Sequence, residues 1–274
     1  MPGTKSQYPR ISAKNLGLLK LPAFCPRCFW LEMKLWRKNA PFRFRPPGLF
    51  NKLDAFQKAA IIDYWVDNSR APAWLGPFKS AEVVLEGTKL AVDIPEFGLT
   101  LSGIPDLLLG MPDGEDAVID QKTAYFKDGN DPLRPMYEVQ LNAYAYLANR
   151  VHPAFQKVTR AGFAYFEGQT EVHGANPIDS ISESGQLVEF SAKIAEIEID
   201  PENIIPPLLE EVSELLSQDE IPPDSAECNN CAMLAQYLEI VAEGGLGSLS
   251  DIRSLYRVTD ASAPTVSDLW DPED

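Results

Sequence analysis

The chain has 274 residues, of which 45% are hydrophobic and 10% aromatic, so it can bury a substantial core. This composition excludes an intrinsically disordered chain, which would be poorer in hydrophobic and richer in charged residues. No stretch approaches the ~20 consecutive apolar residues of a membrane span, and the opening residues, MPGTKSQYPR, lack the apolar segment of a secretory signal. We therefore expect a soluble, cytoplasmic protein with no membrane partner.

The formal net charge of -16 argues, by itself, against a polyanionic partner, but the charge is unevenly distributed. Residues 1–60 carry twelve lysines and arginines against two acids, a net +10, so the rest of the chain carries -26. Such asymmetry points to nucleic-acid or membrane contact, or to an acidic tail. Aromatic residues such as Trp30 and Trp36 interleave the basic ones, which suits a strand whose phosphates need cations and whose bases can stack. The aromatic residues alone fit the core of an amphipathic helix better, whereas the basic excess favours the functional interpretation. The candidate DNA-binding residues are Arg37, Lys38, Arg43 and Arg45.

The hydrophobic pattern predicts helices and strands in alternation along the chain. In chain order, it predicts helical structure over 9–38 with a break at 22–26, a helix over 53–68, extended segments over 81–94 and 99–109, a strand over 117–126, a helix over 133–150, strands over 157–168 and 187–200, and a helix over 201–217. The turn residues Pro112, Asp113 and Gly114 predict a hairpin between the segments before and after them. This order implies a mixed α/β fold.

The last part of the chain differs in composition from the rest. Residues 243–274 are rich in Gly, Ser, Asp and Pro, and they carry seven acids against two bases, a net -5. This composition predicts a flexible acidic tail, which is a candidate contact for a protein partner.

The predicted hairpin brings together three charged residues. Asp120 and Lys122 are two apart on one strand, so their side chains point to the same face. Asp106 lies at the neighbouring strand, where the register can place its carboxylate beside that of Asp120. Two adjacent carboxylates repel unless a cation neutralises them, and oxygen ligands select Mg²⁺ or Mn²⁺. A surface strand with an ordinary salt link is the alternative explanation of Asp-x-Lys alone.

Two further observations favour a functional site over a surface salt link. Asp106 follows Gly103 and Pro105 in an otherwise apolar segment, where an unpaired charge costs free energy. Gln140 and Tyr144 are four apart on a predicted helix, so they share a face and can both reach the site.

The sequence contains three motifs in the order Gly103-x-x-Asp106, Asp120-x-Lys122-Thr123 and Gln140-x-x-x-Tyr144. This ordered set resembles the PD-(D/E)XK nuclease superfamily, in the branch of RecB-type nuclease domains and Cas4-like proteins. The resemblance spans roughly residues 20–235. It implies a restriction-endonuclease-like core with a mixed central sheet flanked by helices. It also implies that the two acids and the backbone carbonyl of Gln121 bind the catalytic Mg²⁺ or Mn²⁺, that Lys122 serves the attacking water, and that Gln140 and Tyr144 support the site.

The chain departs from the family pattern at one metal ligand. Many members carry a His on the helix before the sheet, but the two histidines of this chain, His152 and His173, both follow the lysine. The corresponding helix offers Asp54 and Gln57. We expect Asp54 to replace the histidine as a ligand, with a surface acid or helix cap as its alternative role, and we expect structural or exposed roles for both histidines.

The four cysteines form two pairs with a two-residue spacer, Cys25-Cys28 and Cys228-Cys231. This spacing lets each pair grip one metal, and an intracellular location disfavours disulfides. Spacing alone leaves Zn²⁺ and a [4Fe-4S] cluster open. Cas4-like nucleases carry a cluster on one early and three late cysteines, whereas Tyr237 stands where a further late cysteine would fall. Because CPRCFWL resembles the early segment of that family, we expect [4Fe-4S], with Zn²⁺ as the alternative.

Together these features predict one nuclease-like domain over 1–242, closed by the two cysteine pairs at one metal centre, and a tail over 243–274. The leading functional hypothesis is a metal-dependent DNA nuclease acting on single-stranded or end-bearing DNA. One alternative is a catalytically weakened nuclease fold that serves as a DNA-binding or scaffold subunit of a larger complex. Another is a redox or iron-sulfur protein without nuclease activity.

Overall fold

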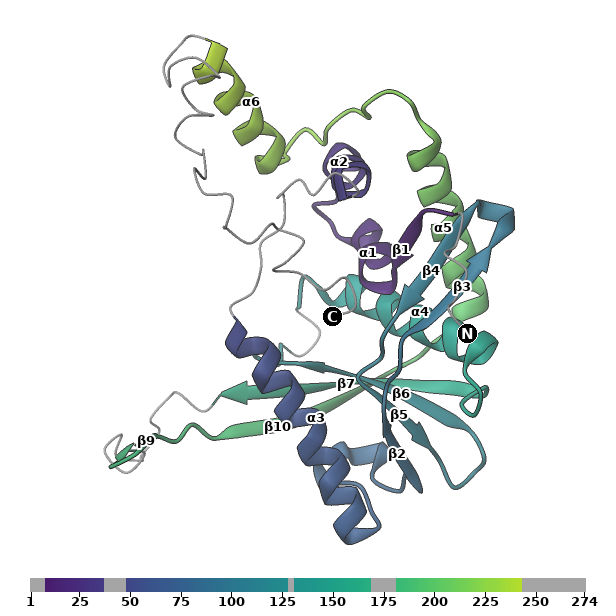
Figure 1. Ribbon diagram of the computed structural model, residues 1–274, viewed down its shortest axis with the longest axis vertical. Coiled ribbons are helices and arrows are strands. Elements are labelled where there is room, and N and C mark those ends of the chain that lie inside the picture. Colours follow the sequence, from purple (N-terminus) through teal and green to yellow (C-terminus); the bar gives the residue numbers. More distant parts are fainter. Residues whose placement is uncertain (1–7, 37–47, 128–130, 169–180, 243–274) are drawn as a thin grey trace, which may run out of the picture. The chain divides into compact units, whose positions relative to one another are not determined.

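The computed structural model describes residues 8–36, 48–127, 131–168 and 181–242 (Figure 1). The candidate DNA-binding residues Arg37, Lys38, Arg43 and Arg45, as well as His173 and the predicted tail, lie outside these residues. The chain divides into two compact units, which we treat separately. The first contains the described residues up to Pro22 and from Gly48 to Glu214. The second contains Ala23 to Trp36 and the described residues from Leu215 onwards.

A five-stranded mixed sheet forms the centre of the first unit (Figure 1). Its strand order is β10-β7-β6-β5-β2, with β6 and β7 parallel and the other pairs antiparallel. The strands are β2 (Val83–Glu86), β5 (Leu107–Gly110), β6 (Asp116–Lys122), β7 (Val158–Gly168) and β10 (Phe190–Ile197). Helix α4 (Arg134–Val151) connects β6 to β7, as the crossover between two parallel strands requires.

A separate three-stranded sheet has the order β1-β4-β3 and consists of β1 (Arg10–Ser12), β4 (Leu99–Gly103) and β3 (Leu90–Ile94). The helical prediction for 9–38 was wrong at its start, because fully buried Ile11 pairs in parallel with Leu101. The remaining elements are α1 (Ala13–Gly17), η1 (Leu18–Lys20), α2 (Pro26–Trp36), α3 (Gly48–Asn68), η2 (Ala73–Phe78), η3 (Pro95–Phe97), β8 (Ile181–Ser182), β9 (Gly185–Gln186), α5 (Pro201–Ser217) and α6 (Asn229–Ala242).

The predicted hairpin at the centre of the sheet is confirmed. Strands β5 and β6 pair antiparallel around a turn in which Gly114 has a φ of +79°, a left-handed conformation that favours glycine. Leu107 pairs with Ile119, so the next position along the ladder sets Asp106 opposite Asp120. The hairpin therefore carries both predicted acids to the same end of the two strands.

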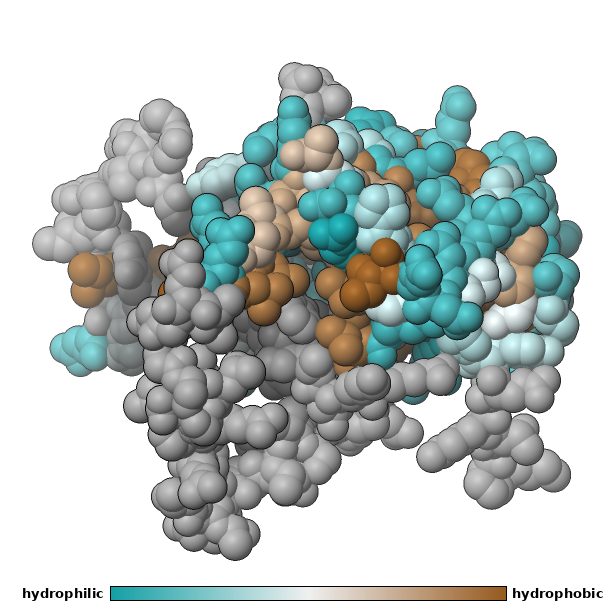
Figure 2. Space-filling model, turned by 90° about the horizontal axis from the view of Figure 1, so that it is seen from above, coloured by the Kyte–Doolittle hydropathy of each residue, from teal (hydrophilic) through white to brown (hydrophobic). Residues whose placement is uncertain are grey.

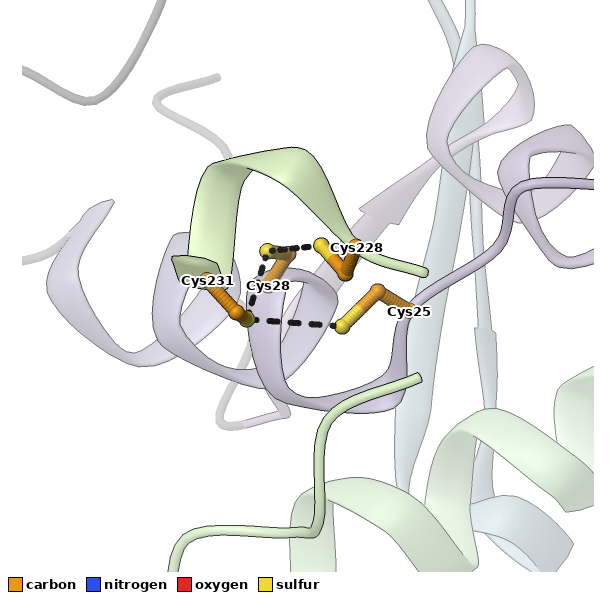
Figure 3. Close-up of side chains that lie close together, drawn as sticks. All are labelled: Cys25, Cys28, Cys228 and Cys231. Atoms are coloured by element: carbon orange, nitrogen blue, oxygen red, sulfur yellow. Dashed lines mark hydrogen bonds between the residues drawn. The ribbon is translucent and has the colours of Figure 1, made fainter. Parts of the chain in front are cut away.

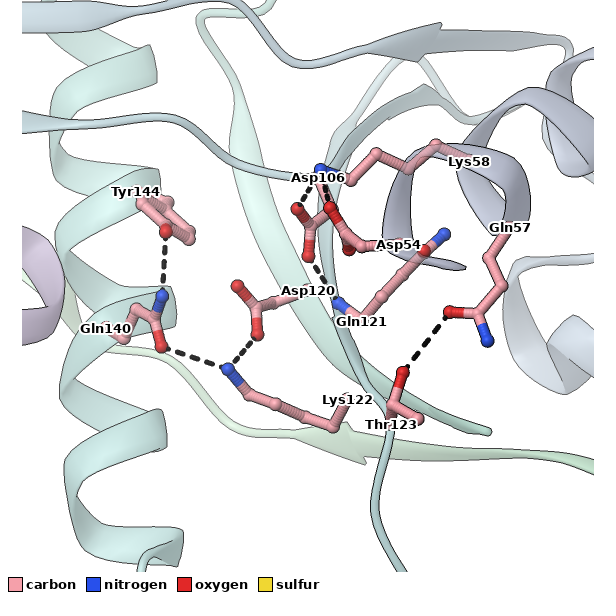
Figure 4. Close-up of polar contacts among 10 residues, drawn as sticks. All are labelled: Asp54, Gln57, Lys58, Asp106, Asp120, Gln121, Lys122, Thr123, Gln140 and Tyr144. Atoms are coloured by element: carbon pink, nitrogen blue, oxygen red, sulfur yellow. Dashed lines mark hydrogen bonds and ion pairs between the residues drawn. The ribbon is translucent and has the colours of Figure 1, made fainter. Parts of the chain in front are cut away.

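Helices pack on both faces of the five-stranded sheet. Ile119 of β6 lies in a hydrophobic core with Ile61 of α3, so α3 covers the face to which odd-numbered β6 residues point. The ammonium of Lys122 lies 4.1 Å from the ring centre of Tyr137, so α4 covers the opposite face. Asp120 and Lys122 consequently face α4, and the side chain of Gln121 points toward α3, as Figure 4 shows.

Helix α3 was predicted with the right type. Phe56 on this helix is 70% exposed, whereas Gln57 and Ile61 are buried. The stripe that faces the sheet is thus polar toward the start of the helix and apolar farther on. An apolar periodicity cannot detect a stripe whose first half serves a polar site.

The surface contains hydrophilic side chains with hydrophobic ones scattered among them, as the face drawn in Figure 2 shows. The exposed large hydrophobic residues include Leu49, Phe50 and Phe56 of α3. Singly exposed apolar side chains are normal on protein surfaces. In the part of the chain that the structure describes, no helix has both the length and the apolarity to cross a membrane.

Candidate active site and candidate metal centre

Asp106 lies between β4 and β5 and is held by two different elements (Figure 4). The backbone N–H of Gln121 donates to Asp106 Oδ2 at 2.6 Å, and Lys58 Nζ lies 2.7 Å from Asp106 Oδ1. Burial raises the pKa of the Asp106 carboxyl to about 6, the charge of Asp120 adds to this effect, and Lys58 opposes it. Both carboxylate oxygens are therefore engaged, and the mutual repulsion of the two acids favours a cation beside them.

Asp120, Lys122, Gln140 and Tyr144 form one continuous polar chain from β6 to α4 (Figure 4). Lys122 forms an ion pair with Asp120 and donates to Gln140 Oε1 at 3.2 Å. Gln140 Nε2 donates to the Tyr144 hydroxyl oxygen at 2.7 Å. Burial raises the pKa of Tyr144 well above its usual value, so the hydroxyl keeps its proton. The structure thus brings together the residues that the strand and helix periodicities placed on facing surfaces.

Gly103 explains why the sequence motif begins with glycine. A Cβ atom at this position would lie 2.6 Å from Tyr144 Cε1, which is closer than carbon atoms can approach without displacement. Any larger residue at position 103 would push the tyrosine ring away from β4. The glycine therefore positions Tyr144 against the polar chain described above.

Lys58 is a site residue that the sequence analysis did not identify. Its ammonium lies 2.7 Å from Asp106 Oδ1 and 2.8 Å from Asp54 Oδ2, and only 14% of the side chain is exposed. Burial lowers the pKa of Lys58, but the two carboxylates outweigh burial and raise it above the usual value. The spacing of Asp54 and Lys58, four apart on a predicted helix, was the signal that could have revealed this residue.

Buried amide groups line the side of β6 that faces α3. The hydroxyl of Thr123 donates to Gln57 Oε1 at 3.5 Å, and Gln57 Nε2 has no hydrogen-bond partner among the described residues. The side-chain amide of Gln121 is also buried, and it forms no hydrogen bond within the same part of the chain. Because buried polar groups without partners cost free energy, such groups commonly mark a functional site or bound water.

The acidic residues fit a divalent cation as a pair. Asp120 Oδ2 is buried, and its positive partner among the described residues is the Lys122 ammonium. Carboxylate oxygens and a backbone carbonyl are the donors that Mg²⁺ and Mn²⁺ prefer. Asp54 does not join Asp106 and Asp120 in one compact group of ligands among the described residues, since the four cysteines alone meet that description. Asp54 instead reaches Asp106 through the ammonium of Lys58.

His152 has a structural role. Its Nδ1 atom accepts hydrogen bonds from the backbone N–H groups of Ala154 at 3.1 Å and Phe155 at 2.9 Å. Burial lowers the pKa of His152, which keeps the ring neutral and able to accept them. The side chain thereby shapes the turn that follows α4.

The four cysteines meet at one point in the second unit (Figure 3). The Sγ atom of Cys28 lies 3.5 Å from the Sγ atoms of both Cys228 and Cys231. The Sγ atoms of Cys25 and Cys231 lie 3.7 Å apart. All four sulfurs lie within 4.8 Å of one another. These separations are far longer than a disulfide bond of about 2.05 Å, so the four residues are free cysteines, placed so that they could hold one metal.

Both cysteine pairs stand at the start of a helix. Cys25 and Cys228 immediately precede their helices, and Cys28 and Cys231 lie in the first turns of α2 and α6. Helix N-termini favour negative charge, so this placement stabilises thiolates. The two segments are also joined beside the sulfurs, because the Ser225 hydroxyl donates to the Phe24 carbonyl oxygen at 2.7 Å.

The separations between the sulfurs match a single tetrahedral ion. A zinc ion with Zn–S bonds of about 2.3 Å places its four sulfurs about 3.8 Å apart. A [4Fe-4S] cluster binds each thiolate to a different iron atom, so its cysteine sulfurs must lie well beyond the 4.8 Å that encloses this group. The identity of the metal, a [4Fe-4S] cluster or Zn²⁺, stays a prediction.

A mixed sheet that presents two acids and a lysine at a central hairpin, with a glutamine and a tyrosine from the crossover helix, defines the class of restriction-endonuclease-like folds. The sequence matches the PD-(D/E)XK nuclease superfamily over residues 29–236. The chain belongs to this superfamily. Its membership of the RecB-type or Cas4-like branch stays a prediction.

Solved structures of similar fold include two exonucleases. The alkaline exonuclease from Laribacter hongkongensis is 16% identical, with a TM-score of 0.45 and coverage of 85% of this chain and 96% of that chain. A phage-related exonuclease from Haemophilus somnus 129PT is 13% identical, with a TM-score of 0.48 and coverage of 77% and 93%. These similarities are too distant to indicate an activity. A comparison with curated proteins found no match.

Proposed function

We propose that this protein is a DNA nuclease that hydrolyses phosphodiester bonds with Mg²⁺ or Mn²⁺. The observation that supports it most is the junction at β6, where Asp120 and Lys122 meet each other and the Gln140–Tyr144 pair. We assign the metal ligands to Asp106, Asp120 and the backbone carbonyl of Gln121. Asp54 is paired with Lys58 and would become a further ligand only if the lysine also left Asp54.

The chain's own residues supply positioning and charge. A bound divalent ion would polarise a phosphoryl oxygen and lower the pKa of a water molecule. Lys122 would orient that water or stabilise the negative charge that develops on the phosphate, because its ammonium is fixed beside Asp120. Gln140 holds the ammonium through its amide oxygen, and Tyr144 fixes the orientation of that amide.

We further propose that the substrate is single-stranded DNA or DNA with ends, contacted by the basic N-terminal segment. Full-length protein with Mn²⁺ should degrade a linear oligonucleotide and a linear duplex, and should leave a covalently closed circle intact. Gel analysis of end-labelled linear DNA and of the circle measures this directly. Equal cleavage of the circle would replace the end requirement with internal cleavage while leaving the nuclease assignment in place.

The alternative function is a DNA-binding or scaffold subunit with a weakened site, with the acidic tail contacting a protein partner. One observation favours it: Asp106 and Asp120 each already have a lysine partner. Under this alternative, the protein would bind labelled DNA with normal affinity in a gel-shift assay and would cleave none of it under any divalent metal.

We assign zinc to the four-cysteine centre on the sulfur separations described above. A structural zinc site has four protein ligands and no open position, which suits a role in folding. Zinc thiolates also persist in a reducing cytoplasm, where disulfides do not, and we keep the cytoplasmic location as a prediction. Elemental analysis of purified protein, together with the visible absorption that an iron-sulfur cluster would give, distinguishes the two metals.

A further inference from the structure

Lys58 is the only site residue that joins α3 to the loop before β5 by charge among the described residues (Figure 4). Its ammonium lies between Asp54 Oδ2 and Asp106 Oδ1, at 2.8 Å and 2.7 Å. The two carboxylates thus bind the ammonium as they would bind a metal ion that they share. Because the lysine is largely buried, little solvent screens the interaction.

The partners of Lys58 differ from those of Lys122. Lys122 has Asp120, the amide oxygen of Gln140 and the Tyr137 ring around it, so it keeps neutral partners if Asp120 turns to a metal. The contacts of Lys58 are two carboxylates. Any cation that draws on Asp106 therefore competes directly with Lys58.

The charges of the site support the same conclusion. Asp54, Asp106 and Asp120 face two lysines, which leaves a net charge of -1 among these five groups. A divalent ion carries twice the positive charge needed to neutralise this net charge of the site. Removal of the Lys58 charge would leave -2, which a divalent ion balances.

From this geometry, and on the basis of the proposed function, we propose that Lys58 is a built-in counter-cation of Asp106 that competes with the divalent metal. In this role Lys58 limits metal affinity, and it leaves Asp106 when a metal binds. Asp54 then retains the lysine, four residues along the same helix, and keeps the displaced ammonium near the site.

The test is a Mn²⁺ titration of full-length protein that retains its cysteine-bound metal, with free Mn²⁺ followed by electron paramagnetic resonance. We expect Lys58→Gln and Lys58→Met to bind Mn²⁺ about tenfold more tightly than the parent, a change of about 1.4 kcal/mol. Lys52→Met is the matched control, because Lys52 is an exposed lysine on the same helix. The control should bind Mn²⁺ as the parent does, and Lys58→Arg, which keeps the charge, should not gain affinity.

Two results would overturn the proposal, and they differ in what else they affect. If the two neutral variants stay folded by circular dichroism and bind Mn²⁺ no more tightly than the parent, while Asp120→Asn abolishes the binding, Lys58 is not a competitor and the nuclease assignment stands. If Asp120→Asn leaves Mn²⁺ binding unchanged in every background, the acidic site is not the metal site, and both the Lys58 role and the proposed metal mechanism fail.

Discussion

Lys122→Met is expected to lower the rate of divalent-dependent DNA cleavage by about 10²- to 10⁴-fold, the usual cost of removing a proton-transfer or charge-stabilising group. The same change leaves Asp120 buried with no ion-pair partner, since only 4% of its side chain is exposed. We therefore also expect a loss of about 3–5 kcal/mol in the free energy of unfolding when no divalent ion is present. Single-turnover cleavage and chemical denaturation measure the two effects separately.

A double variant separates chemistry from stability. Asp120→Asn combined with Lys122→Met removes both charges, so it should recover most of the lost stability while cleavage stays abolished. Lys193→Met is the control, because Lys193 is also an ion-paired strand lysine, 3.3 Å from Glu167, and it is 53% exposed. The control should cleave within about twofold of the parent. Cleavage near the parent rate in Lys122→Met would remove the lysine from the mechanism.

If the four cysteines bind zinc as proposed, Cys25→Ser is expected to release that zinc and to unfold the second unit. The thiolate pairs come from segments about 200 residues apart, so one ion fixes both helix starts. Structural zinc contributes about 10–16 kcal/mol of apparent binding free energy in small domains, which exceeds the stability of most domains. Elemental analysis should fall from about one zinc per chain to none, and a thermal transition should be lost or shifted to lower temperature.

The control for the cysteine variant lies on the same helix as Cys231. Met233 is 50% exposed on α6 and has no part in the sulfur cluster, so Met233→Ser should keep the metal and the transition. A Cys25→Ser protein that contains no metal but unfolds at the same temperature as the parent would show that the centre is not structural. Iron and sulfide in the parent protein in place of zinc would instead contradict the identity of the metal.

The central hairpin and its facing helix could be predicted because their rules are local. The two-residue period of a strand put Asp120 and Lys122 on one face, and the helical period put Gln140 and Tyr144 on another. The resemblance to the PD-(D/E)XK superfamily then implied that these faces meet. The ion pair and the two hydrogen bonds follow from that arrangement.

The role of Lys58 could not be predicted in this way. Its contact with Asp106 joins residues 48 apart in sequence, and it depends on how α3 packs against the sheet. The same packing leaves Phe56 exposed, while Gln57 is buried and Lys58 contacts Asp106. Tertiary packing, not helical propensity, chose the buried face.

The identity of the cysteine-bound metal depends on distances that a sequence does not contain. Zinc and iron-sulfur sites use the same two-residue spacing between cysteines. The expectation of a [4Fe-4S] cluster therefore rested on the resemblance to Cas4-like nucleases. Sulfur separations of 3.5 Å and 3.7 Å support the proposal of zinc, because they suit ligands that share one ion. The same limit applies to β1, where Ile11 is held by pairing with Leu101 far along the chain.

The most direct test of the central claim is cleavage of end-labelled linear DNA by the full-length protein in Mn²⁺, compared with an Asp106→Asn, Asp120→Asn double variant. Divalent ions are omitted, not chelated, in the negative control, so that the cysteine-bound metal stays in place. The account predicts cleavage that requires the added ion and that is lost in the folded double variant. Cleavage by the double variant at the parent rate, or an equal rate without added divalent ion, would contradict it.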